Sequence, residues 1–170
     1  MELDQPVGSY SHNIIIKYDE LNKTITGNII IGDIEIIITN FSIRDFRLGE
    51  IGAIDINLQS NWNQKLNNVY VELEILDEDK SLNIIKGADL SIEKSEKTTI
   101  FWDTKELSEK EYRIIAKVKQ NSKLISENEY RVILSSENAI IQKEQIIKSK
   151  LILILSATII TIIIIITLKK

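Results

Sequence analysis

Residues 67–79 read NNVYVELEILDED, and the alternation inside this stretch decides the fold. Val69, Val71, Leu73 and Ile75 fall on one side of an extended chain, whereas the residues between them are tyrosine and glutamate. A strand with one apolar and one polar side is typical of an antiparallel sheet that packs one face and wets the other. The stretch therefore predicts a strand that lies over a core.

The same alternation returns on both sides of this stretch. It gathers apolar side chains on one face at Ile54, Ile56 and Leu58, at Tyr112, Ile114, Ala116 and Val118, and at Tyr130, Val132 and Leu134. On the strand at 54–58, Asp55 falls on the opposite, wet side. Polar turn clusters separate the runs at 19–23, 61–68, 77–81, 93–97, 103–110 and 121–123. This arrangement predicts an all-β antiparallel sandwich, with a β-barrel as the alternative.

The composition excludes several classes of site. Isoleucine accounts for 37 of the 170 residues, so we read it as a generic apolar residue. The chain has no cysteine and one histidine, His12, which removes disulfides, cysteine-based metal sites and thiol catalysis. The net charge of −4 offers no basic surface for nucleic acid. No phosphate loop, paired-carboxylate motif or nucleophile elbow is present, so we expect no cofactor, no small-molecule substrate and no enzymatic activity.

The C-terminal stretch from Leu151 to Leu168 reads LILILSATIITIIIIITL and carries no charge. At the rise of an α-helix it extends about 27 Å, close to the hydrocarbon thickness of a bilayer. Lysines stand on both sides, at 148 and 150 and at 169 and 170, where they can reach the head groups. The stretch predicts a single transmembrane helix in the cell membrane. A buried pair of strands is the alternative, which the lack of a turn signal disfavours.

Motifs between Ile34 and Leu134 carry a family resemblance. In order they are IEIIITNFSI (34–43), Leu48-Gly49-Glu50, IDINLQSN (54–61), NNVYVELEILDED (67–79), IFWDT (100–104) and the series Leu107, Tyr112, Ile114, Ala116, Val118. This order resembles the immunoglobulin-like repeats of archaeal and bacterial surface proteins, the cell-adhesion-related (CARDB-like) class. The resemblance implies an immunoglobulin-like sandwich that binds, adheres or spaces and is not an enzyme. The chain departs from the family at Lys80 and at Lys110 and Glu111, where the family prefers glycine.

These observations divide the chain into five parts. Residues 1–32 form an N-terminal extension with a hairpin whose turn lies near Asn22-Lys23; it either extends a sheet or is the remnant of a preceding repeat. Residues 33–134 form the sandwich, and 135–150 a juxtamembrane stalk. We expect the stalk to be helical, because Ile140, Ile147 and Leu151 fall at helical spacing. Residues 151–168 form the transmembrane helix, and 169–170 a basic tail.

Few side chains qualify as candidates for a site. Trp62 lies in a polar loop and is the candidate for an exposed contact, whereas Trp102 alternates with Ile100 and should lie in the core. The cluster at 77–79 lacks the glycine and downstream glutamate of a calcium loop, so we interpret it as a solvated hairpin tip. His12 has no nucleophile or orienting partner near it in sequence, so we expect a surface residue.

Two asparagines, Asn22 and Asn40, begin N-glycosylation sequons, which matter only if the domain is outside the cell. Residues 1–13 do not read as a signal peptide, which suggests a domain on the cytoplasmic face. The resemblance to surface proteins favours the outside, and a leader encoded upstream of Met1 would reconcile the two. Our first hypothesis is therefore a single-pass, extracellular module that binds a protein or glycan. The alternative is a tail-anchored accessory subunit of a membrane complex.

Overall fold

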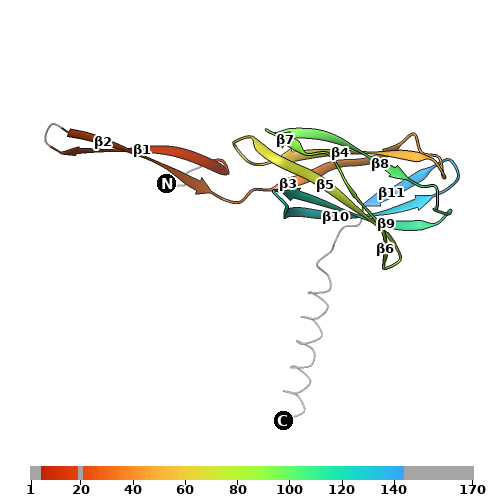
Figure 1. Ribbon diagram of the computed structural model, residues 1–170. Coiled ribbons are helices and arrows are strands. Elements are labelled where there is room, and N and C mark those ends of the chain that lie inside the picture. The colour runs from red at the N-terminus through yellow and green to blue at the C-terminus, as the bar shows by residue number, and fades with distance from the viewer. Residues whose placement is uncertain (1–4, 19–20, 144–170) are drawn as a thin grey trace, which may run out of the picture.

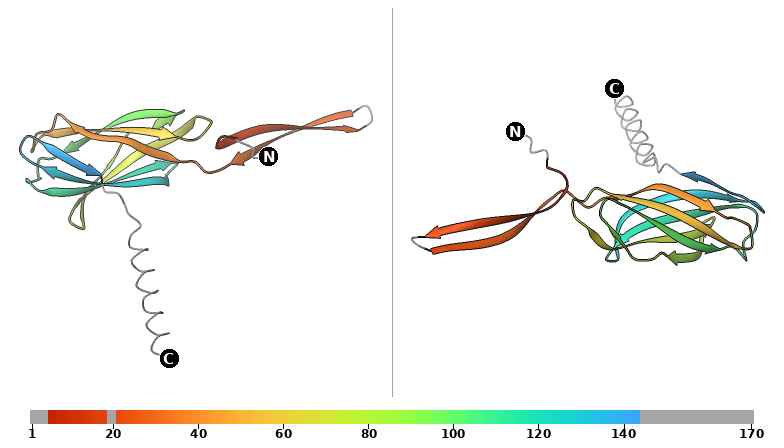
Figure 2. Two further views of the ribbon diagram at one scale, coloured as in Figure 1. Left: turned by 180° about the vertical axis from the view of Figure 1, so that it is seen from behind. Right: turned by 90° about the horizontal axis from the view of Figure 1, so that it is seen from above.

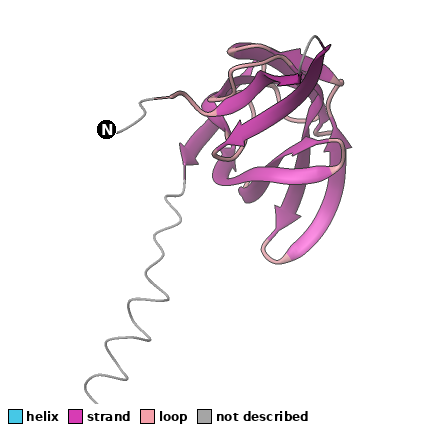
Figure 3. Cartoon of the chain, turned by 90° about the vertical axis from the view of Figure 1, so that its left-hand side faces the viewer, coloured by secondary structure: helices cyan, strands magenta, loops and turns pink. Residues whose placement is uncertain are grey.

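The computed structural model describes residues 5–18 and 21–143, and every regular element in this part of the chain is a β-strand (Figures 1 and 3). The strands are β1 (Gly8–Tyr18), β2 (Leu21–Ile31), β3 (Ile36–Arg44), β4 (Ile51–Ser60), β5 (Leu66–Asp77), β6 (Lys80–Lys86), β7 (Leu90–Ile92), β8 (Ser95–Asp103), β9 (Glu111–Gln120), β10 (Lys123–Leu134) and β11 (Ala139–Lys143). The predicted all-β fold is confirmed for the described residues.

Nine of these strands form two antiparallel sheets that pack face to face. The larger sheet has the order β11-β10-β9-β5-β6, with β7 also paired to β5, and the smaller sheet has the order β3-β4-β8. Figure 2 shows the two layers from behind and from above. The architecture is therefore a β-sandwich.

The core lies between the sheets and consists of the residues that alternation assigned to it. Val69, Val71, Leu73 and Ile75 of β5 are at most 1% exposed, and the inward residues of β9 are at most 2% exposed. Trp102 of β8 is 1% exposed and meets Tyr112 edge to face, with 6.5 Å between the ring centroids. The predicted strand faces and the core position of Trp102 are confirmed.

One residue on a predicted wet face is covered. Asp55 of β4 points away from the core, yet its side chain is only 8% exposed. Arg44 of β3 and Lys97 and Thr99 of β8 enclose the carboxylate from both neighbouring strands. Alternation gives the side of a sheet on which a residue lies, and it cannot show that long polar side chains will cover it there.

The predicted helical stalk is wrong for its described part. Residues 139–143 form β11, which pairs antiparallel with β10 and lengthens the larger sheet. Ala139 and Ile141 pack against the core, whereas Ile140 between them is 57% exposed. An alternating segment beside an open sheet edge gains backbone hydrogen bonds as a strand, and this outweighed the helical spacing.

Two motifs quoted from the sequence meet at one end of the sandwich. The buried Thr104, which follows β8, accepts a hydrogen bond from the backbone N–H of Gly49 (3.0 Å) and donates one to the carbonyl of Glu50 (2.8 Å). Gly49 has a φ of +87°, a conformation that suits glycine. Leu48-Gly49-Glu50 and Trp102-Asp103-Thr104 thus form one corner.

The hairpin of β1 and β2 is a separate two-stranded sheet that projects from one end of the sandwich (Figures 1 and 2). The strands pair from Gly8 with Ile31 to Tyr18 with Leu21, so their connection is residues 19–20. The predicted turn position was three residues too late, because Asn22 and Lys23 lie inside β2.

No helix among the described residues has the length and apolarity needed to cross a membrane. The predicted transmembrane helix from Leu151 to Leu168, the remainder of the stalk at 144–150 and the tail at 169–170 lie outside the described residues.

Candidate functional site

The pairing of β1 with β2 sorts the hairpin side chains onto two unlike faces. Residues directly opposite each other in an antiparallel pair share a face, and successive residues alternate between faces. We define the apolar face by the side chains Tyr10, Ile14, Ile16, Tyr18, Leu21, Ile25 and Ile29, with His12, Lys23 and Gly27 between them. The polar face carries Ser9, Ser11, Asn13, Lys17, Asn22, Thr24, Thr26 and Asn28, together with Ile15 and Ile30.

Side-chain hydrogen bonds agree with this division of the hairpin. On the polar face, Ser11 donates to Asn28 (2.8 Å), and Thr26 donates to Asn13 (2.9 Å). These cross-strand pairs fix the register, since a one-residue slip would move one partner to the other face.

The apolar face is exposed. Six of its large side chains are between 45% and 75% exposed, namely Ile14, Ile16, Tyr18, Leu21, Ile25 and Ile29. Contiguous apolar patches of this kind mark interaction sites in soluble domains, whereas single exposed apolar residues need no explanation. A two-stranded ribbon without cover is also at best marginally stable in water. The apolar face is therefore the strongest candidate for a binding surface.

A polar clamp fixes the root of the hairpin to the sandwich. Asn63, in the loop between β4 and β5, accepts a hydrogen bond from the backbone N–H of Ser9 (3.0 Å) and donates one to its carbonyl (3.2 Å). Gln64 donates to the same carbonyl (3.0 Å). A Cβ on Gly8 would lie 2.0 Å from the Asn63 side chain, so glycine permits this approach.

Trp62 lies beside this clamp and is half-buried, packed against the core. It lines a cleft of about 540 Å³ that also includes Ile30, Ile34, Leu124 and Ile125. Its role as an exposed contact stays a prediction. It shares the cleft with Ile30 of β2, which places it at the root of the hairpin.

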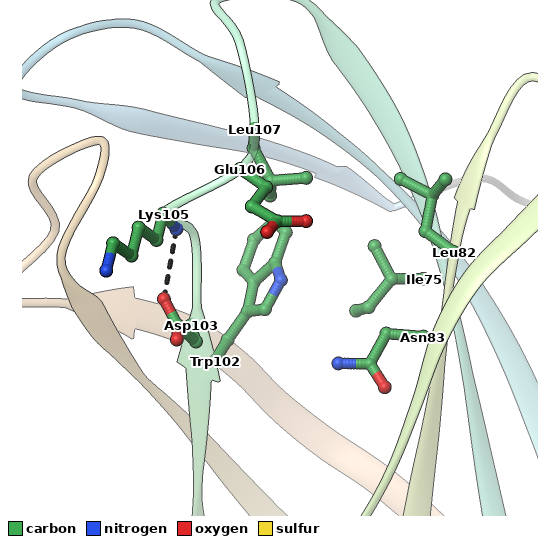
Figure 4. A pocket seen from close by; sticks show the side chains of 8 residues that line it. All are labelled: Ile75, Leu82, Asn83, Trp102, Asp103, Lys105, Glu106 and Leu107. Atoms are coloured by element: carbon green, nitrogen blue, oxygen red, sulfur yellow. Dashed lines mark hydrogen bonds between the residues drawn. The ribbon is translucent and has the colours of Figure 1, made fainter.

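A second hollow lies at the other end of the sandwich, between β6 and β8 (Figure 4). It measures about 350 Å³, and its lining includes Ile75, Asn83, Trp102 and Glu106. The Asp103 carboxylate accepts a hydrogen bond from the backbone N–H of Lys105 (3.0 Å) and so serves as a turn cap. The hollow brings together no nucleophile and base.

The remaining sequence candidates lie apart from one another. His12 is exposed on the apolar face of the hairpin opposite Gly27. The sequon residues Asn22 on β2 and Asn40 on β3 are both exposed, and their glycosylation stays a prediction. No group of three or more histidine, aspartate or glutamate side chains in the described part of the chain could hold a metal ion.

The acidic cluster at 77–79 forms the turn between β5 and β6, as a solvated hairpin tip should. Asp77 pairs with Lys110 at 2.6 Å, and Asp79 pairs with Arg113 at 3.0 Å. Lys110, just before β9, and Arg113, in β9, thus neutralise two of the carboxylates. Glu78 supplies the positive φ of the turn, at 53°, so Lys80 needs no special conformation.

Asp55 is the acid with the largest pKa shift among the described residues, and no sequence motif pointed to it. Hydrogen bonds from Thr99 (2.6 Å), Lys97 (2.9 Å) and Arg44 (2.9 Å) lower the pKa of Asp55 from 3.8 to about 2. All four side chains belong to the outer face of the smaller sheet. Two cations already compensate the carboxylate, so we interpret this cluster as a cross-strand staple of the sheet.

The outer face of the larger sheet carries ion pairs between β5 and β9. Lys117 pairs with Glu74 and Lys119 with Glu72, both at 2.6 Å. The hydrogen bond from Lys117 lowers the pKa of Glu74, and the pKa of Lys117 rises for the same reason. This face is polar and self-neutralised, in contrast to the apolar face of the hairpin.

No protein-family model matches this chain, and no curated protein matches it. Among solved structures, a β-glucuronidase from glycoside hydrolase family 2 is similar over 66% of this chain and 13% of that chain. The identity is 14% and the TM-score 0.42. The chain thus spans a small part of that protein, and a likeness at this level carries no argument about function.

Proposed function

We propose that this protein is a non-catalytic, membrane-anchored surface module that binds a protein partner or glycan, or spaces one from the membrane. The observation that carries the proposal is the projecting hairpin, whose apolar face is uncovered, whereas the outer face of the larger sandwich sheet carries ion pairs between β5 and β9. A sandwich that holds such a surface on a polar clamp has the parts of a binding module. The described residues offer no competing catalytic arrangement.

Three features of the sandwich support the immunoglobulin-like assignment. The larger sheet has β5, β9 and β10 as neighbours and the smaller has β3, β4 and β8, which corresponds to the two sheets of immunoglobulin-like folds. The Tyr112 hydroxyl, near the start of β9, accepts from the backbone N–H of Ser108 (3.1 Å) and donates to its carbonyl (3.3 Å). This is the tyrosine corner of such sandwiches. Third, the corner at Thr104 brings together two of the motifs on which the family resemblance rests.

The proposed anchor rests on the sequence from Leu151 to Leu168. Thirteen isoleucines and leucines without a charge favour insertion by about 4–8 kcal/mol at the values for a helix centre. We place the sandwich outside the cell, with the lysines at 169 and 170 facing the cytoplasm.

Alkaline carbonate extraction of membranes from cells that express the full chain tests the anchor. We expect the protein to stay in the membrane pellet. The double variant Ile160→Lys/Ile163→Lys should release it, because a lysine near the middle of a span costs about 3 kcal/mol. The matched control Ile14→Lys/Ile25→Lys places the same charges on the hairpin and should stay in the pellet. Extraction of the unaltered chain would overturn the anchor.

Protease added to intact cells tests the side of the membrane. For an outside domain we expect the sandwich to be removed, with a membrane-bound stub left behind. A chain that survives on intact cells and is cut only after lysis would place the sandwich in the cytoplasm. The tail-anchored accessory subunit would then replace the surface module.

A further inference from the structure

We infer that the apolar face of the hairpin binds the same face of a second copy of this chain, so that two hairpins stack as a small four-stranded sandwich. This inference rests on the proposed function and deepens it by naming the partner. It starts from the six large apolar side chains of β1 and β2 that are 45% to 75% exposed. A second copy would provide the layer that the facing sheet provides for the apolar sides of β5 and β9.

The rows of the apolar face match themselves when two hairpins lie antiparallel. From root to tip the opposed pairs are Tyr10 with Ile29, His12 with Gly27, Ile14 with Ile25, Ile16 with Lys23, and Tyr18 with Leu21. If a two-fold axis passes through the row of Ile14 and Ile25, the small Gly27 faces Lys23 of the second copy. The tyrosine row at the root then faces the tyrosine row at the tip. Such self-complementarity is what a two-fold interface requires.

The area suits a weak, specific contact. A fully exposed isoleucine or leucine side chain has roughly 120 Å² of apolar area, and a tyrosine roughly 200 Å². At its exposed fractions the apolar face offers about 500 Å², so a symmetric pair buries about 1,000 Å², the lower limit for a specific interface. Anchoring both copies in one membrane would raise their effective concentration.

Lipid is the poorer occupant of the apolar face. The ribbon has two strands, so the outer edge of each leaves backbone N–H and C=O groups unpaired, and these cannot be satisfied in hydrocarbon. Binding at the lipid surface usually needs a basic polar face, and the polar face of this hairpin carries one cation among its described residues, Lys17. A stacked second copy covers the apolar side chains and leaves both edges in water.

Cross-linking of single-cysteine variants tests the inference directly, because the natural chain has no cysteine. Residues 24 and 25 are neighbours in β2 and lie on opposite faces of the hairpin. Full-length Ile25→Cys therefore places the thiol on the apolar face, and full-length Thr24→Cys places it on the polar face. Each variant is reconstituted into phosphatidylcholine vesicles at several protein-to-lipid ratios and treated with a short bis-maleimide. Stacked sheets lie about 10 Å apart, which such a reagent spans. We expect at least about tenfold more dimer from Ile25→Cys than from Thr24→Cys, since tenfold needs only a modest difference in contact energy.

Charge substitutions in the Ile25→Cys background sharpen the test. Ile14→Lys puts a charge in the centre of the interface and should lower the dimer yield by about tenfold or more. The matched Ile15→Lys puts the same charge on the polar face and should leave the yield within about twofold. Equal cross-linking of Ile25→Cys and Thr24→Cys would show random collision and overturn the inference. An absence of cross-links would also overturn the inference. Iodide quenching of a fluorophore on residue 25 then tells the remaining cases apart: quenching means that the face is free, and a lack of quenching means that it is buried in lipid. The carbonate result is independent, so the anchor can stand where the dimer fails.

Discussion

The strands β1 and β9 share an alternating pattern of apolar residues, but their apolar faces lie in opposite environments. β9 reads EYRIIAKVKQ and β1 reads GSYSHNIIIKY, and both place apolar residues on alternate positions. In β9, Ile114 is completely buried under the facing sheet, whereas Ile14 in β1 is 61% exposed. The difference lies in what is stacked above the strand. It teaches that alternation defines a face that can be covered and does not supply the cover.

The largest expected effect is the loss of a buried aromatic ring from the core of the sandwich, which should lower the free energy of unfolding. Trp102→Ala removes an indole that is 1% exposed and in contact with Tyr112, so we expect a loss of about 3–5 kcal/mol in the free energy of unfolding. Urea denaturation of residues 1–148, followed by circular dichroism, measures the loss. Phe101→Ala, on the exposed neighbour of Trp102, is the control and should cost less than about 1 kcal/mol.

Acid should weaken the sandwich through Asp55. Its folded pKa of about 2 lies below the ordinary 3.8, so this carboxylate stabilises the fold above about pH 4 and loses its effect as the pH falls towards 2. The shift corresponds to at most about 2.5 kcal/mol, and screening through the half-exposed Arg44 and Lys97 reduces it to about 1 kcal/mol.

Urea midpoints between pH 2 and pH 6 test the contribution of Asp55. Asp55→Asn should flatten the acid loss relative to the natural chain. Asp45→Asn removes an exposed carboxylate on the same Arg44 and should leave the pH profile nearly unchanged. Identical pH profiles for the two variants would mean that the cluster does not act as a staple.

Removal of the clamp at Asn63 should affect the hairpin and leave the sandwich unchanged. Asn63→Ala removes both hydrogen bonds to Ser9, which we expect to weaken the hairpin root by about 1 kcal/mol, since each exposed bond contributes little. Hydrogen exchange should speed up in β1 and β2 and stay unchanged in β9. Faster exchange throughout the sandwich would show that hairpin and sandwich unfold as one unit.

The smallest effect is expected on the apolar face itself. Ile14→Ser in a dilute monomer removes a side chain that contacts mainly water, so the free energy of unfolding of the sandwich should change by less than about 0.5 kcal/mol. The same substitution at Ile114 should cost several times more, because that side chain is buried. Urea melts at low protein concentration provide both values, and a large loss at Ile14 would mean that the hairpin already has a cover within one chain.

The sequence alone determined six strands of the sandwich (β3, β4, β5, β8, β9 and β10), the inward faces of β4, β5, β9 and β10, and the core position of Trp102. Those features follow from alternation, which depends only on the geometry of an extended chain. It also located a hairpin before residue 32, with an error of three residues in the position of the turn. It also singled out Trp62 as a candidate for an exposed contact, a role that depends on a binding partner.

Only the tertiary structure decided which faces are covered. Asp55 is enclosed because Arg44, Lys97 and Thr99 arrive from two other strands, and their arrival depends on sheet order and register. Residues 139–143 became a strand because the edge of β10 was open beside them. The hairpin kept its apolar face bare because no second sheet among residues 5–18 and 21–143 packs against it. Cover is a property of elements distant in sequence, and local spacing therefore cannot supply it.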